Sequence, residues 1–205
     1  MKLSNSATQN VNFKTKFGGG LLKESGIYLL EIEELEPATS QAGNEMLNGK
    51  FRVRDDDAAG LVLRRKLVAT NNRSTGDATA DEAAKQKTEG WFLQGYCAMR
   101  AMNEQLSREE ILAELETMDE IDLPQFAAAQ VNGTVYAEVV VRLKKDDQGR
   151  DFVYNDVRNF VMPEDVEKAD KLRWPHSPAV LAFLSGGRPS QESEVPAGGT
   201  SAAVV

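Results

Sequence analysis

Basic side chains alternate along one short stretch of the sequence, in a pattern suited to contacts with phosphate groups. Lys50, Arg52 and Arg54 are spaced two apart, so in an extended strand they project from one face. A second basic run, Arg64-Arg65-Lys66, follows, and residues 50–73 together carry about +4. Because single strands are held by basic grooves and by aromatic rings that stack on bases, this pattern predicts a nucleic-acid-binding face.

Further candidates for this face lie later in the chain. The basic residues are Lys50, Arg52, Arg54, Arg64, Lys66, Arg142 and Arg158, and the candidate stacking rings are Tyr28, Tyr136 and Tyr154. The alternative for the basic residues is a solvated strand face, since outward positions of a strand are normally charged. The alternative for each ring is burial in the core.

The motifs of several enzyme classes are missing from the sequence. Neither a Gly-x-x-x-x-Gly-Lys-Ser/Thr phosphate loop nor a Gly-x-Gly-x-x-Gly fingerprint occurs. The single histidine, His176, and the single cysteine, Cys97, are more readily explained as packing residues than as a base and a nucleophile. The acidic runs Asp55–Asp57 and Asp146–Asp147 fall in predicted hairpin turns, where Asp is favoured. We therefore expect a non-catalytic protein that uses no cofactor and no metal.

The elements that would position the basic residues form a simple order. Alternating apolar residues predict three strands, and a helical stretch with a capping box at Ser107 follows; the strands are 26–36, 46–54 and 61–70. Gly90 and Gly95 are expected to break the first helix, which spans about residues 78–106. Two more strands and two short helices complete the order; they are 134–144, 152–161, 163–170 and 178–184.

Three strands, a helical insertion and two strands is the element order of an OB-fold. We therefore predict a mainly β protein, a five-stranded OB-fold-like barrel with helices between strands 3 and 4 and a short C-terminal helix. A mixed α+β sheet with a helical layer is the alternative. The predicted parts are a basic N-terminal arm (1–24), the OB core (25–163, insertion about 78–122), a C-terminal helical segment (164–184) and a disordered tail (185–205).

Composition sets broad limits on the function. The 205 residues carry a net charge of -8, but residues 104–122 alone hold about -7, so the total does not argue against a nucleic-acid ligand. No apolar run approaches a membrane span, and the N-terminus lacks the apolar core of a secretory signal. The expectation is a cytoplasmic protein with no membrane partner.

Several spaced motifs resemble one protein family. They are Ser25-Gly26-Ile27-Tyr28, the turn at residues 39–44, Lys50-Phe51-Arg52-Val53, Asn132-Gly133-Thr134-Val135 and the strand Asn155–Phe160. Residues 25–163 are in this respect similar to the bacteriophage single-stranded-DNA-binding proteins often grouped as a phage family of unknown function. Many single-stranded-DNA-binding proteins end in an acidic tail that recruits partners, whereas the tail here has acids only at Glu192 and Glu194 and ends in Gly199–Val205, so recruitment of partners through the tail is not expected.

The resemblance implies a specific role. It implies an OB-fold protein that coats single-stranded DNA without strong sequence preference, during phage DNA replication or recombination in the infected host cell. Candidate partners are single-stranded DNA, phage or host replication and recombination proteins, and further copies of the chain. The alternative is a phage interaction or assembly protein that docks through the acidic insertion or the C-terminal segment.

Overall fold

The computed structural model describes residues 20–186, apart from residues 56–57 and 73. Most of the predicted N-terminal arm and nearly all of the predicted disordered tail lie outside the described residues. The strands are β1 (Ser25–Thr39), β2 (Glu45–Val53), β3 (Val62–Val68), β4 (Thr134–Lys145), β5 (Asp151–Val161) and β6 (Arg173–Trp174). The helices are α2 (Ala78–Asn103), α3 (Arg108–Thr117), α4 (Leu123–Gln130), α5 (Pro163–Glu167) and α6 (Pro178–Leu184).

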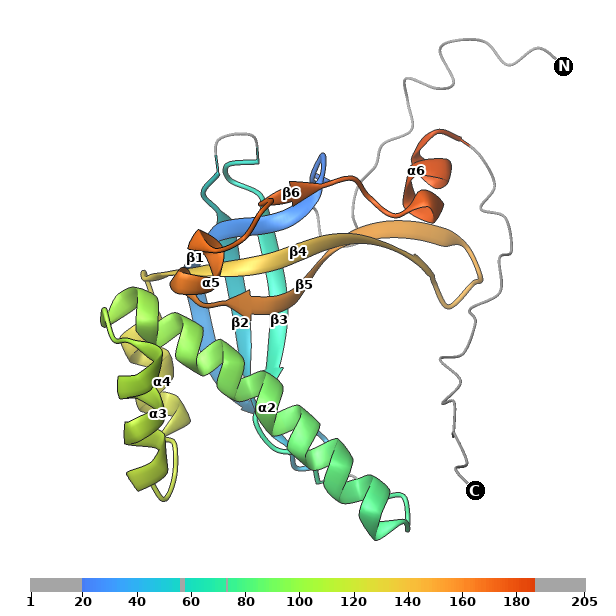
Figure 1. Ribbon diagram of the computed structural model, residues 1–205. Helices are drawn as coiled ribbons and strands as arrows, with labels where there is room; N and C mark the ends of the chain where they lie inside the picture. Colours follow the sequence, from blue (N-terminus) through green and yellow to red (C-terminus); the bar gives the residue numbers. More distant parts are fainter. Residues whose placement is uncertain (1–19, 56–57, 73, 187–205) are drawn as a thin grey trace, which may run out of the picture.

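The strands form one antiparallel sheet in the order β3-β2-β1-β4-β5, with β6 added to the start of β1 (Figure 1). The long β1 makes this possible, since residues 26–31 pair with β4 and residues 30–39 pair with β2. The sheet curls until its two end strands meet, so that Arg65 of β3 lies 3.6 Å from Asp156 of β5. With the helices between β3 and β4, this arrangement confirms the predicted mainly β, OB-fold-like class.

The core lies inside the curl and follows the predicted alternation. Tyr28, Leu30 and Ile32 are completely buried, as are Leu47, Phe51 and Val53 of the neighbouring strand β2. Strict alternation from Tyr28, Leu30 and Ile32 predicts Leu35 on the opposite face of β1, and this prediction is wrong. A bulge between Ile32 and Glu34 shifts the register and returns Leu35 to the core.

The first strand is also longer than predicted. The sequence predicts a strand that ends at residue 36, before Pro37, yet β1 continues to Thr39, with Pro37 opposite Leu47 of β2. Beyond Glu31, β1 pairs with β2 alone. Proline is tolerated on such an edge, because its missing N–H group is not needed there.

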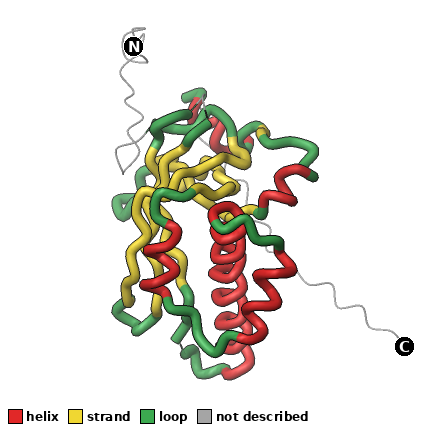
Figure 2. The backbone as a smooth tube through the Cα atoms, turned by 90° about the vertical axis from the view of Figure 1, so that its left-hand side faces the viewer, coloured by secondary structure: helices red, strands yellow, loops and turns green. Residues whose placement is uncertain are grey.

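Helix α2 runs unbroken through Gly90 and Gly95, against the predicted break. Gly95 serves packing, because a Cβ atom at this position would lie 3.0 Å from Leu67 of β3 and 3.1 Å from Phe160 of β5. Beside it, Phe92 and Tyr96 enter the core. Glycine therefore lets α2 lie close to the two end strands. Figure 2 shows α2 beside the sheet, with α3 next to it.

Buried polar contacts join the two ends of the described chain. His176 is buried, and its Nδ1 lies 3.2 Å from Ser25 Oγ while its Nε2 lies 3.1 Å from the Leu22 carbonyl oxygen. Ser25 Oγ also accepts a hydrogen bond from the backbone N–H of Val141 in β4. The segment before α6 is thereby fixed to the start of β1. Within the described ranges, no helix is long and apolar enough to cross a membrane.

Candidate nucleic-acid interface

The basic residues of β2 project outward as predicted, but carboxylates of β1 already neutralise them. Lys50 Nζ lies 2.8 Å from Glu34 Oε1 and 3.2 Å from Glu33 Oε2. Arg52 forms an ion pair with Glu33, and Arg54 lies 3.0 Å from Glu31. These three predicted residues therefore share a ladder of ion pairs with β1, and carry little free positive charge.

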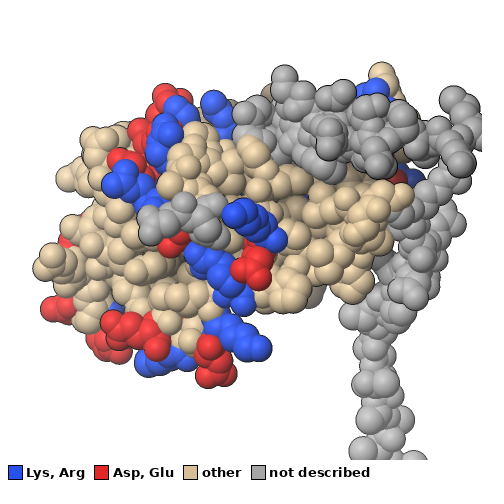
Figure 3. All heavy atoms as spheres, turned by 90° about the horizontal axis from the view of Figure 1, so that it is seen from above, with Lys and Arg blue, Asp and Glu red and all other residues tan. Residues whose placement is uncertain are grey.

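The pKa values of this ladder reflect the pairing. Burial acts to raise the pKa of Glu33, but hydrogen bonds and the positive charges of Arg52 and Lys50 hold that pKa below its ordinary value. Hydrogen bonds to Glu34 and Glu33 raise the pKa of Lys50. Figure 3 shows Lys and Arg side chains interleaved with Asp and Glu on the face seen from above.

The basic residues of β3 differ from those of β2. Arg64 and Lys66 are exposed, and neither forms an ion pair with any residue that the structure describes. Arg64 lies opposite Lys50 in the strand register, and Lys66 lies opposite Asn48. Arg65, between them, projects from the other side of β3. Of the two basic strands β2 and β3, it is therefore β3 that carries cations without an ion pair among the described residues.

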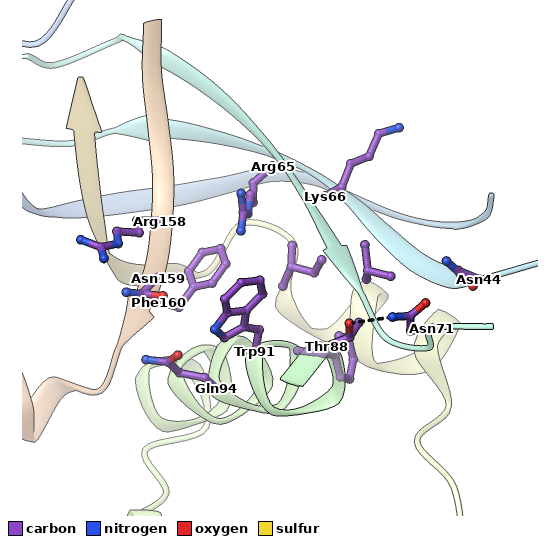
Figure 4. A pocket seen from close by; sticks show the side chains of 13 residues that line it. Asn44, Arg65, Lys66, Asn71, Thr88, Trp91, Gln94, Arg158, Asn159 and Phe160 are labelled. Carbon is purple, nitrogen blue, oxygen red and sulfur yellow. Dashed lines mark hydrogen bonds between the residues drawn. The ribbon is translucent and has the colours of Figure 1, made fainter. Parts of the chain in front are cut away.

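An open hollow of about 410 Å³ lies where β3, β5 and α2 meet. Figure 4 shows Arg65 pointing from β3 toward Trp91 of α2, with Arg158 on the side of β5. Trp91 is 57% exposed, and Lys87 Nζ lies 5.0 Å from its ring centroid. The polar side chains of the lining are Arg65, Lys66, Arg158, Asn44, Asn71, Thr88, Gln94 and Asn159.

The positive charges continue from the hollow over β5 and β4. Asp156 accepts two ion pairs, from Arg65 at 3.6 Å and from Arg142 at 2.9 Å. Arg158 lies 3.4 Å from Glu138 and remains exposed. The predicted residues Arg64, Lys66, Arg142 and Arg158 are thus distributed around the closing seam of the sheet.

The predicted aromatic residues separate into two groups. Tyr28 is completely buried in the core, with its hydroxyl donating to the Glu24 carbonyl oxygen at 2.8 Å. Its assignment as a stacking ring was therefore wrong, because its face of β1 points inward. Tyr136 and Tyr154 are half-buried on the outer side of the sheet, and Tyr154 lies 5.8 Å from Phe152 between ring centroids. Burial and the nearby Asp156 raise the pKa of Tyr154.

Trp91 was missed by the sequence prediction, which treated its segment only as a helix. A signal was present, because a tryptophan directly after Lys87-Thr88-Glu89-Gly90 stands in a polar part of that helix. Across the described ranges, no three His, Cys, Asp or Glu side chains gather in a way that could hold a metal ion.

Comparisons with known proteins do not assign the chain to a family. No protein-family model matches the chain, and no curated protein matches it. Among solved structures, the chain is similar to a chain of "Yeast RPA bound to ssDNA", with 12% identity, a TM-score of 0.25, and coverage of 91% of this chain and 94% of that chain. A likeness of this size carries no argument about the ligand of the present chain.

Proposed function

We propose that this chain is a non-catalytic single-stranded-DNA-binding protein with little sequence preference. One observation carries the proposal: an exposed tryptophan stands in a hollow whose walls supply Arg65, Lys66 and Arg158. Cations and an accessible aromatic ring are the two components that hold single strands.

Each component has its own part in binding. The guanidinium and ammonium groups neutralise backbone phosphates and release counterions. The ring of Trp91 stacks on a base, and this contact suits any base because every base has an aromatic face. Bases in a duplex are already stacked on one another, so a ring that stacks on a base selects unpaired bases.

The biological setting is part of the same proposal. The motifs of residues 25–163 support a phage protein of DNA replication or recombination, acting in the cytoplasm of the infected host cell. The OB-fold-like class is compatible with this role, since such folds often bind oligonucleotides.

The test is a binding series with labelled oligo-dT of increasing length, repeated over a range of salt concentrations. We expect affinity to rise with length and to fall linearly in a log–log plot against salt. Trp91→Ala should weaken binding by about 5- to 150-fold, which corresponds to about 1–3 kcal/mol for one stacked base.

Leu181→Ala serves as the matched control, since Leu181 is also an exposed apolar residue but lies on α6. It should bind like the unmodified chain. An absence of oligo-dT binding at about 50 mM salt, where phosphate contacts act strongly, would contradict the proposal. Equal affinity for a duplex of the same length would contradict its preference for single strands.

A further inference from the structure

A second hollow, which we call the acidic groove, lies on another part of the molecule. It measures about 420 Å³ and lies between α2, α3, the segment that leads into α4, the start of β2 and the residues that follow β3. Its apolar lining residues are Ala69, Phe92, Leu93, Leu115, Met118, Ile121 and Leu123. Met118 is 40% exposed, so part of this apolar lining is open to solvent.

Carboxylates also line the acidic groove. They belong to Glu45, Glu89, Asp119 and Glu120. Among the described residues, Glu45, Asp119 and Glu120 form no ion pair, and Glu89 reaches only Lys85, at 3.9 Å. A hollow lined by apolar side chains and unpaired carboxylates suits a segment that is both apolar and basic.

The chain itself contains such a segment. Residues 1–19 include three lysines and no acidic residue, and Phe13-Lys14-Thr15-Lys16-Phe17 alternates aromatic and basic side chains. In extended form this segment presents its two phenylalanines on one side and its two lysines on the other. We propose that the acidic groove binds residues 13–17 of a second copy of the chain.

The position of Gly20 indicates that residues 13–17 do not reach the acidic groove of their own chain, so the bound segment belongs to a second copy. Asn155 Nδ2 donates to the Gly20 carbonyl oxygen at 2.9 Å, and Leu22 adjoins His176 near Ser25, at the start of β1. The acidic groove includes Glu45, which pairs with Thr39 at the other end of β1. About 46 Å of strand separates Ser25 from Thr39 at about 3.3 Å per residue, whereas the seven residues from 13 to 20 span at most about 25 Å.

The resulting contact joins two different surfaces, the segment of one copy and the acidic groove of the next. Such a head-to-tail contact leaves a free segment at one end and a free groove at the other, so it extends into chains of copies unless it closes into a ring. This association does not depend on DNA.

Sedimentation velocity of the full chain without DNA, over a range of protein concentrations at low salt, tests this proposal. The sedimentation coefficient should rise with concentration. Lys14→Glu combined with Lys16→Glu should weaken the association about tenfold or more, because it places negative charges next to the carboxylates of the acidic groove. Asp119→Lys combined with Glu120→Lys should have the same effect, and joining all four changes in one chain should restore association.

The matched control reverses two exposed acidic residues of α3 that do not line the acidic groove, Glu109→Lys with Glu116→Lys, and should leave association unchanged. A chain that sediments as a monomer at every concentration overturns the proposal, and so does a fourfold variant that stays monomeric. An oligo-dT too short for two copies tests the proposed function separately, because its binding does not depend on association between copies. Loss of association in the Lys14→Glu/Lys16→Glu or Asp119→Lys/Glu120→Lys variant should therefore not weaken this binding.

Discussion

Arg65 of β3 and Asp156 of β5 meet at 3.6 Å across the seam where the two ends of the sheet come together. The same carboxylate lies 2.9 Å from Arg142 of β4, so a single Asp restrains two guanidinium groups. Both arginines belong to the surface proposed to bind phosphate groups. Asp156 therefore occupies, in the free protein, a place where a phosphate can compete.

Replacing this carboxylate should strengthen DNA binding. Asp156→Asn keeps the side chain's shape but removes its charge, which leaves Arg65 and Arg142 free for phosphates. We expect about a two- to tenfold gain in affinity for oligo-dT at about 0.1 M salt, with a steeper salt dependence. Fluorescence anisotropy measures both quantities. Weaker binding by this variant would show that Asp156 positions the arginines and does not compete for them.

The two basic strands should contribute unequally. Arg64→Gln with Lys66→Gln removes two cations that have no ion pair among the described residues, and should lower the salt slope by about 2. Arg52→Gln with Arg54→Gln removes two cations already paired with Glu33 and Glu31, and should change the slope less. A larger loss from the second pair would place the binding surface on β2.

Stability should depend on pH through Glu33. Its pKa in the folded protein lies below the ordinary value of 4.5, so its stabilising effect is complete above that value and is lost as the pH falls through the lower folded-state pKa. Melting temperatures of the unmodified chain should therefore decline in acid below about pH 4.5. In Glu33→Gln this part of the decline should be absent, so the two curves should converge at low pH.

His176 should matter for stability and not for DNA binding. Its two ring nitrogens contact Ser25 Oγ and the Leu22 carbonyl oxygen inside the protein, so His176→Ala removes two buried polar contacts. We expect the free energy of unfolding to fall by about 1–3 kcal/mol in urea denaturation. Lys171→Ala, an exposed neighbour, should stay within about 0.5 kcal/mol of the unmodified chain. A neutral effect of His176→Ala would mean that these contacts add nothing.

Much of the fold could be predicted, because it depends on local patterns. Two-residue periodicity located the five main strands, and the Ser107 capping box located the start of α3. The predictions failed where distant parts of the chain decide the outcome. The bulge after Ile32 depends on pairing with β2, and the continuity of α2 through Gly95 depends on contacts with β3 and β5.

The interface was harder to predict for the same reason. A basic strand can be recognised in the sequence, but the sequence does not show that Glu31, Glu33 and Glu34 of β1 lie beside it. Both faces of the first strand carry apolar residues around Tyr28, so the alternation there does not show which face points into the core. Trp91 lies near Arg65 because α2 packs against β3, although the two residues are about 25 positions apart in the chain. A local sequence pattern does not predict such packing.

The contact at Gly95 has a consequence for how the hollow can change. Gly95 brings α2 against Leu67 and Phe160, and so sets how far Trp91 stands from the two strands that face it. The distance between Trp91 and the facing strands is thus controlled by Gly95, which does not itself line the hollow. Gly95→Ala adds one carbon atom at this contact and can change the width of the space between the Trp91 ring and the strands. Every side chain that would touch the ligand stays the same.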